Sequence, residues 1–186
     1  LATERGGIIW NGDDTSVTEG AKFDWRITGI VDDGTNLAIS WAAKYNGVDV
    51  NPCNATVGPG APVFHAVAGG SGGTLSMLRS YAQGDDYVLG QANAPGQASA
   101  VNLSTTNTVC AGTVATTTIP VDAAIPAGTR GIVALQGKPQ LPVPAGMSTE
   151  HWAEPLMFVR VPTPIYEFIV GTGAKATTPR REIADT

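Results

Sequence analysis

Two neighbouring segments of the chain alternate between apolar and polar residues with a period of two. Their apolar residues are Phe23, Trp25 and Ile27, and then Leu37, Ile39, Trp41, Ala43 and Tyr45. Successive side chains of a β-strand point to opposite faces of a sheet, so this pattern gives each segment one apolar face. The stretch 32–36 between them reads Asp-Asp-Gly-Thr-Asn, which is typical of a hairpin turn. We therefore predict an antiparallel hairpin whose two tryptophans pack in one core.

Further segments rich in β-branched and aromatic residues follow along the chain. The additional strand candidates are 7–10, 63–67, 75–81, 98–103, 113–120, 131–135, 156–161 and 165–170. The segment 75–81 also fits a helical turn, but we favour a strand. An α/β sheet would need crossover helices of ten or more residues, and the pattern provides none. We predict an all-β fold, either an antiparallel Greek-key sandwich or a split barrel of short strands with long Gly- and Pro-rich loops.

The length of 186 residues is suited to one domain. Irregular, Gly- and Pro-rich stretches are expected at 46–62, 84–97 and 138–155. Hydrophobic alternation ends near residue 172, and the remainder carries the only adjacent basic pair, Arg180 and Arg181. We predict a single β domain over 1–172 and a linker over 173–186 that leads towards a following domain.

Charge and composition exclude some classes of partner. The formal net charge is −5, and the 11 Lys and Arg residues are scattered, whereas binding of a phosphate backbone needs them clustered. We therefore expect no nucleic-acid partner. The chain opens Leu-Ala-Thr-Glu instead of with Met, so we expect a mature protein or an internal segment of a longer one.

Two cysteines, Cys53 and Cys110, are the only ones in the chain. Their spacing fits neither a CxxC zinc knuckle nor a redox pair. Both lie in polar, turn-rich segments, so we favour a disulfide between them over the alternative of two buried free thiols. An acidic domain with a disulfide is typical of an exported protein.

No motif in the sequence points to catalysis or to a resident cofactor. The run 69–73 formally matches G-x-S-x-G around Ser71, but a hydrolase elbow needs a strand before it and a helix after it on an α/β sheet, and here the match arises because the run is nearly all glycine. We therefore interpret it as a flexible loop. His65 lies in a strand candidate and is interpreted as structural. His151, beside Trp152 in a long loop, is a candidate to face a partner. The three Asp-Asp pairs, at 13–14, 32–33 and 85–86, are interpreted as turn formers, with structural calcium as the alternative.

Four stretches together resemble a known family. They are ITGIV (27–31) with LAISW (37–41), LRSY (78–81), AIPAGTRGIVALQGKP (124–139) and RREIADT (180–186). In these stretches the chain is similar to the haem-free β domain of the outer-membrane decahaem c-type cytochromes, the OmcA/MtrC family. The haem-binding CxxCH runs of that family are absent from this chain, because Cys53 is followed by Asn-Ala-Thr and Cys110 by Ala-Gly-Thr.

The resemblance implies a structural and interaction domain of a cell-surface multihaem cytochrome, without haem of its own and not an enzyme in itself. It implies c-type haems only in neighbouring segments, and location at the extracellular face of the outer membrane. The expected partners are a haem domain of the same polypeptide, an outer-membrane cytochrome complex, and an extracellular acceptor or flavin. His151 and Trp152 are the candidate interface residues. The alternative from another class is a free-standing exported module that binds carbohydrate or another ligand through exposed aromatic side chains.

Overall fold

The computed structural model describes residues 9–10, 13–54, 75–83, 86–89, 98–142, 156–159 and 161–177. These residues form strands of two to ten residues and one short helix. In chain order the elements are β1 (Ile9–Trp10), β2 (Asp13–Asp14), α1 (Thr15–Gly20), β3 (Phe23–Asp32), β4 (Asn36–Tyr45), β5 (Val48–Val50), β6 (Leu75–Gln83), β7 (Asp86–Leu89), β8 (Ser99–Asn102), β9 (Thr108–Ala111), β10 (Val114–Pro120), β11 (Arg130–Gly137), β12 (Gln140–Pro142), β13 (Leu156–Phe158) and β14 (Ile165–Ile169). The all-β class predicted from the sequence is confirmed.

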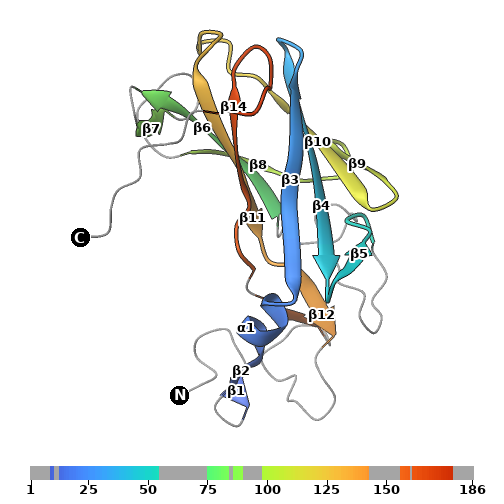
Figure 1. The fold of residues 1–186 in the computed structure, drawn as a ribbon. Coiled ribbons are helices and arrows are strands. Elements are labelled where there is room, and N and C mark those ends of the chain that lie inside the picture. The colour runs from blue at the N-terminus through green and yellow to red at the C-terminus, as the bar shows by residue number, and fades with distance from the viewer. Residues whose placement is uncertain are drawn as a thin grey trace, which may run out of the picture.

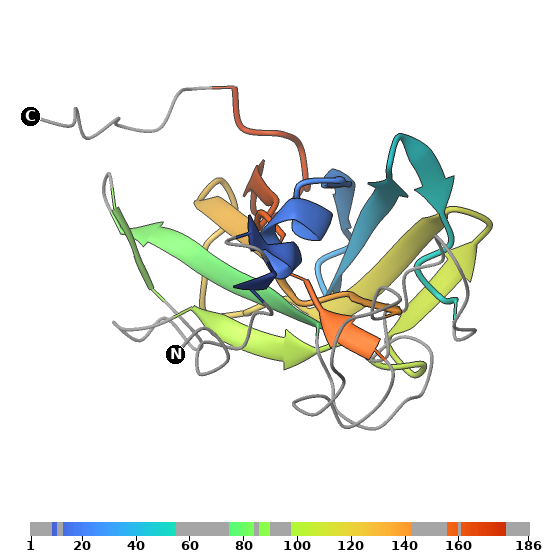
Figure 2. The ribbon, with the colours of Figure 1, turned by 90° about the horizontal axis from the view of Figure 1, so that it is seen from below.

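Two five-stranded antiparallel sheets face each other, as the two views show (Figures 1 and 2). The first sheet has the order β3-β4-β10-β9, and β5 pairs with the end of β4 beside β10. The second has the order β14-β11-β6-β7, and β8 shares the outer edge of β6 with β7. Two further strand pairs, β1-β2 and β12-β13, form small separate sheets. The arrangement is a sandwich and not a split barrel.

The order of strands shows how the chain moves between the two sheets. It leaves the first sheet after β5, returns to it at β9, and crosses again between β10 and β11. The order corresponds to the strands A-B-E-D and G-F-C of an immunoglobulin-type sandwich. The return of β10 to pair with β4 is the kind of long connection that a Greek key contains, although the Greek-key assignment itself stays a prediction.

The predicted hairpin is β3 and β4, joined by the turn at 33–35. Its alternation places Trp25 and Trp41 in one hydrophobic core, 5% and 0% exposed. The indole Nε1 of Trp41 donates a hydrogen bond to Thr117 Oγ1 at 3.0 Å, so this buried donor is satisfied from the neighbouring strand. The pairing shifts by one residue between Ile27 and Gly29, where β3 is bulged.

Close packing in the second sheet depends on one glycine. Gly131 of β11 lies directly opposite Phe168 of β14, whose ring is fully buried. A Cβ at position 131 would lie 2.4 Å from Phe168 Cε1, which is well inside any real contact. The missing side chain therefore leaves room for the aromatic ring against the backbone of β11, next to Tyr81 at a centroid distance of 6.5 Å.

The structure corrects several predictions about the loops. Each stretch predicted to be irregular contains a strand, namely β5 within 46–62, β7 within 84–97 and β12 within 138–155. These strands have only three or four residues, too few to show a hydrophobic period. The six-residue helix α1 was not predicted, because fewer than two turns carry no helical pattern. The strand predicted at 63–67 lies outside the described residues. No helix within the described parts of the chain is long and apolar enough to cross a membrane.

Candidate functional site

The predicted disulfide joins Cys53 and Cys110. Cys110 lies in β9, and Cys53 lies in the turn that follows β5. Asn51 shapes this turn, because its side-chain Oδ1 accepts a hydrogen bond from the Cys53 amide at 2.9 Å and its carbonyl accepts one from the amide of Asn54 at 3.0 Å. Both half-buried sulfur-bearing side chains pack against the core. The bond therefore ties the turn after β5 to β9 of the first sheet, and the alternative of free thiols is wrong.

The chain does not leave the domain at the end of β14. It turns back at 171–173 and runs antiparallel to β14, where the Ile169 amide donates to the Ala174 carbonyl and the Ala176 amide donates to the Glu167 carbonyl, at 2.9 and 3.0 Å. We call residues 171–176 the chain-exit clamp. Residues 173–176, which the sequence pattern assigns to a linker, are therefore paired within the domain, and the linker itself stays a prediction. Residues 178–186, with Arg180 and Arg181, lie outside the described residues.

The chain-exit clamp also contacts the first sheet, at β3. The Gly171 amide donates a hydrogen bond to Asp32 Oδ2 at 2.7 Å, across 139 positions of sequence. Gly173 has a φ of +70°, and a Cβ there would lie 2.5 Å from the carbonyl oxygen of Ile30. Only glycine combines this left-handed conformation with such a close backbone approach. The clamp thus fills the seam where β3 and β14 lie side by side (Figure 1).

Further contacts close the same seam. The indole Nε1 of Trp25 on β3 donates a hydrogen bond to the carbonyl of Pro162, just before β14. The ammonium of Lys175 in the clamp lies 5.9 Å from the ring centroid of Tyr166, within the range of a cation–π contact. The two sheets are therefore joined along one edge by side chains and by the returning chain, and the edge of β14 is covered.

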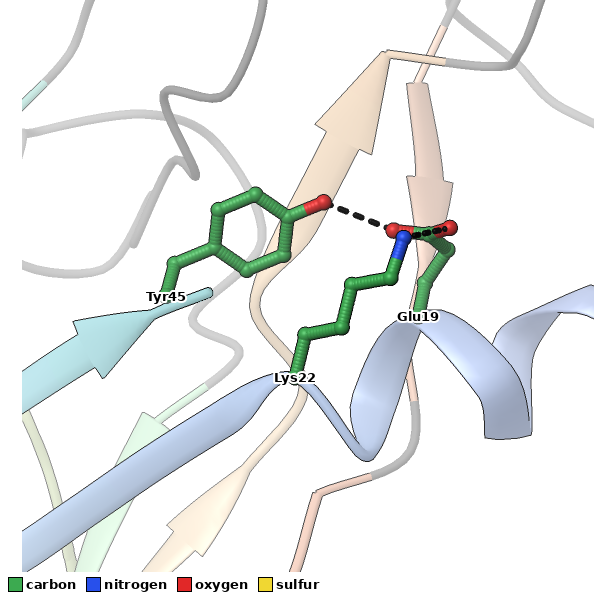
Figure 3. A network of polar contacts seen from close by, with 3 residues as sticks. All are labelled: Glu19, Lys22 and Tyr45. Atoms are coloured by element: carbon green, nitrogen blue, oxygen red, sulfur yellow. Dashed lines mark hydrogen bonds and ion pairs between the residues drawn. The ribbon is translucent and has the colours of Figure 1, made fainter. Parts of the chain in front are cut away.

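A second polar network holds helix α1 against the first sheet (Figure 3). The Glu19 carboxylate accepts a hydrogen bond from the Tyr45 hydroxyl and an ion-paired one from Lys22 Nζ, both at 2.6 Å. Burial, and then the hydrogen bond to the charged Glu19, raise the pKa of Tyr45 above its ordinary value. The Tyr45 ring also packs on Phe23, with centroids 4.9 Å apart. This network fastens a helix end and leaves no free acid or base.

A third polar group lies between the two sheets. Arg79 of β6 is 6% exposed, and its Nη1 donates a hydrogen bond to the carbonyl of Pro120 at the end of β10. Its guanidinium lies 5.6 Å from the ring centroid of Tyr81. The backbone of Asp122 hydrogen bonds to the Tyr81 hydroxyl. We call Arg79, Tyr81 and Asp122 the inter-sheet polar cluster.

The outward face of the first sheet carries few charges away from one end. Val31, Val109 and Val114 are exposed there, at 64%, 68% and 40%. The residues between them across β4 and β10 are small or hydroxyl-bearing, namely Ala38, Ser40, Ala42, Thr116 and Thr118. The charged residues are paired at one end of this face, where Arg26 contacts Asp24 and Lys44 contacts Asp49. An uncharged centre with a charged border is common in protein–protein interfaces.

The structure places only part of the predicted site. His151 and Trp152, predicted to line an interface, lie outside the described residues, as do His65 and Ser71. Asp32 and Asp33 are described, and their carboxylates accept backbone amide hydrogen bonds in the β3–β4 turn, as turn formers do. Within the described residues, no three His, Cys, Asp or Glu side chains gather into a group that could hold a metal.

Comparison with known proteins adds no family to this geometry. No protein-family model matches the chain, and no curated protein sequence matches it. The functional argument therefore depends on the fold, the chain-exit clamp and the surfaces described above.

Proposed function

We propose that this chain is a structural and interaction domain of a larger exported polypeptide, of the kind that the haem-free β domains of OmcA/MtrC cytochromes represent. Its own chemistry is passive. It packs against a following haem domain, limits the access of solvent to that domain, and offers a surface to an outer-membrane cytochrome complex, an extracellular acceptor or a flavin. It binds no haem itself, and His151 and Trp152 remain candidate interface residues.

The chain-exit clamp is the observation that carries this proposal. A flexible tether would leave the chain free directly after β14, whereas here Gly171 and Gly173 are held against β3. The direction in which the chain continues is therefore set by the sandwich. A chain exit with a fixed direction suits a domain that holds the following domain in one orientation. An interface between two domains of one chain typically buries about 600–1,500 Å².

Two other features are compatible with the proposal. A disulfide that closes a long stretch of chain is typical of proteins that fold in oxidising compartments, as an exported domain does. The uncharged centre of the outward face of the first sheet offers a second surface on which a partner can pack. We accordingly propose a location at the extracellular face of the outer membrane.

The test uses the polypeptide as the cell makes it. Its sequence should continue past Thr186 into a CxxCH run within about twenty residues, and the purified protein should show covalent haem absorption. In that protein, Gly173→Ala should shift the midpoint potential of the nearest haem and increase proteolysis after β14. Gly112→Ala is the matched control, because it adds a methyl group in open space in the β9–β10 turn. A haem-free protein that ends at Thr186, or unchanged potentials and proteolysis, would refute the proposal.

The alternative of a free-standing carbohydrate-binding module is less well supported. Sugar stacking needs exposed aromatic faces, but Trp25 and Trp41 are buried in the core. Tyr81 is also buried, and Tyr45 is occupied by Glu19 and Phe23. Four of the eight Trp and Tyr side chains of the sequence are therefore committed to the interior or to other residues.

A further inference from the structure

Two atoms of the inter-sheet polar cluster are buried without a hydrogen-bond partner. They are Nε of Arg79, on the second sheet, and Oδ2 of Asp122, in the loop that follows β10 of the first. Buried polar groups are nearly always satisfied, since leaving one unpaired costs about 1–3 kcal/mol and more when it is charged. One of these atoms is a donor and the other an acceptor, and both belong to residues that contact Tyr81.

No other atom of the cluster forms a hydrogen bond with Arg79 Nε or Asp122 Oδ2, so the cluster does not satisfy them by itself. Arg79 Nη1 donates to the Pro120 carbonyl, and Asp122 Oδ1 accepts from the amide of Ala124 at 3.1 Å. The Tyr81 oxygen is bonded to the backbone of Asp122, which leaves its hydroxyl proton to be donated elsewhere. A group that lies among these side chains would therefore find two donors and one acceptor.

The charges of the inter-sheet polar cluster indicate whether its occupant is an anion, a cation or a neutral molecule. An anion would be close to the carboxylates of Asp122 and Asp32, both of which raise the pKa of Tyr81, although burial is the largest cause of that shift. A cation would face the guanidinium of Arg79, which acts on Tyr81 in the opposite sense. A small neutral molecule that both accepts and donates hydrogen bonds is repelled neither by the carboxylates nor by the guanidinium. Water is the molecule of this kind that proteins enclose most often.

We infer that the inter-sheet polar cluster is a binding site for one internal water molecule, which accepts from Arg79 Nε and donates to Asp122 Oδ2. Internal waters typically make about three hydrogen bonds, and the Tyr81 hydroxyl supplies the third. The water connects β6 of the second sheet to the β10–β11 connection of the first. It thereby joins the two sheets at a point where the core itself is polar.

The first test needs no variant. In a high-resolution crystal structure of the 186-residue chain, a water should lie within hydrogen-bond distance, about 2.7–3.2 Å, of both atoms. In solution, the Arg79 Nε–H resonance should exchange slowly and show a cross-relaxation peak to a long-lived water. The Nε–H of Arg26, whose side chain is 45% exposed, is the internal control and should show neither. A direct ion pair between Arg79 and Asp122, or no water at that position, would overturn the inference.

A mutant cycle tests the coupling that the water carries. Arg79→Met should raise the equilibrium constant of unfolding at least tenfold, because it removes the donor to the water and the donor to the Pro120 carbonyl. Asp122→Asn should then have an effect roughly five- to tenfold smaller in the Arg79→Met background than in the wild type. The exposed pair Arg26→Met and Asp24→Asn is the matched control and should be additive within about twofold. Additive effects in the buried pair would contradict the inference.

Discussion

Substitution of Gly173 by alanine tests whether the chain-exit clamp depends on a close approach between its backbone and β3. The added methyl group would lie 2.5 Å from the Ile30 carbonyl oxygen and 3.0 Å from the Asp32 amide nitrogen. Weak carbon–oxygen contacts between strands lie at about 3.3–3.6 Å, so the clamp would have to move by roughly 1 Å. Both neighbouring atoms belong to the backbone of β3, which cannot give way as the end of a flexible side chain can.

The expected loss has two parts that a control separates. A non-glycine residue in the left-handed region costs about 1–2 kcal/mol, and the forced contact adds about 1–3 kcal/mol. Gly112→Ala carries only the first part, since its φ is +62° and nothing lies within 4 Å of the new Cβ. Gly173→Ala should therefore weaken docking of the clamp by about 2–5 kcal/mol. Because the clamp can separate from β14 on its own, unfolding of the whole sandwich should change less than this.

Hydrogen exchange measures the effect where it arises. The amides of Ile169 and Ala176 pair β14 with the clamp in the native protein. In Gly173→Ala both should exchange at least about 30-fold faster, which corresponds to about 2 kcal/mol. The amides that pair β4 with β10 should be unaffected. If the Ile169 and Ala176 amides exchange at the same rate in Gly173→Ala as in Gly112→Ala, the proposed contact with β3 is wrong. The argument for a fixed chain exit then fails as well.

Three more outcomes follow from contacts described above. Replacing Cys53 and Cys110 together by serine should lower the free energy of unfolding by about 4 kcal/mol, from the chain entropy of closing a 57-residue separation. A loss below about 1 kcal/mol in urea unfolding would contradict this. Gly131→Ala should destabilise by about 1–3 kcal/mol, because its methyl group would overlap the buried Phe168 ring, and an unchanged Tm would argue against this packing. Tyr45→Phe should reduce the alkaline loss of stability. The pKa of the Tyr45 hydroxyl is raised in the folded state. Above about pH 10 the unfolded chain therefore loses this proton while the folded protein keeps it, and stability falls as the pH rises. Equal pH slopes of the urea midpoint in variant and wild type would count against it.

Much of the sandwich could be predicted because its long strands alternate. β3 and β4 have ten residues each and bury every second side chain over most of their length, so periodicity revealed both strands and their shared core. The disulfide could also be predicted from the sequence, since the chain has only two cysteines. The short strands β5 and β7 were missed because pairing with a neighbour creates them, and no hydrophobic period of their own does.

The polar features had weaker signals. Arg79 follows Leu75 and Met77 at every second position of β6, so the sequence pattern itself places a charged residue on the inward face of this strand. The sequence predicts a linker at most of the chain-exit clamp because hydrophobic alternation ends near residue 172. Its Gly-Thr-Gly sequence at 171–173 was the available turn signal. The contact of Gly171 with Asp32 spans 139 positions, and no local pattern predicts a partner so far away.

The disulfide has a kinetic consequence as well as a stabilising one. The first sheet is complete only when β10 has paired with β4. This pairing brings together distant parts of the chain, since the hydrogen bond between Trp41 and Thr117 joins residues 76 positions apart. Chains dominated by such distant pairings fold slowly, because the closure of the loop precedes the contacts that reward it. Once Cys53 and Cys110 are bonded, the open path between Trp41 and Thr117 shortens to roughly twenty residues, which lowers the closure entropy by about 1 kcal/mol. Oxidation before the sheets assemble would therefore speed the nucleation of the sandwich by several-fold and shorten the time during which its unpaired strands are exposed to aggregation.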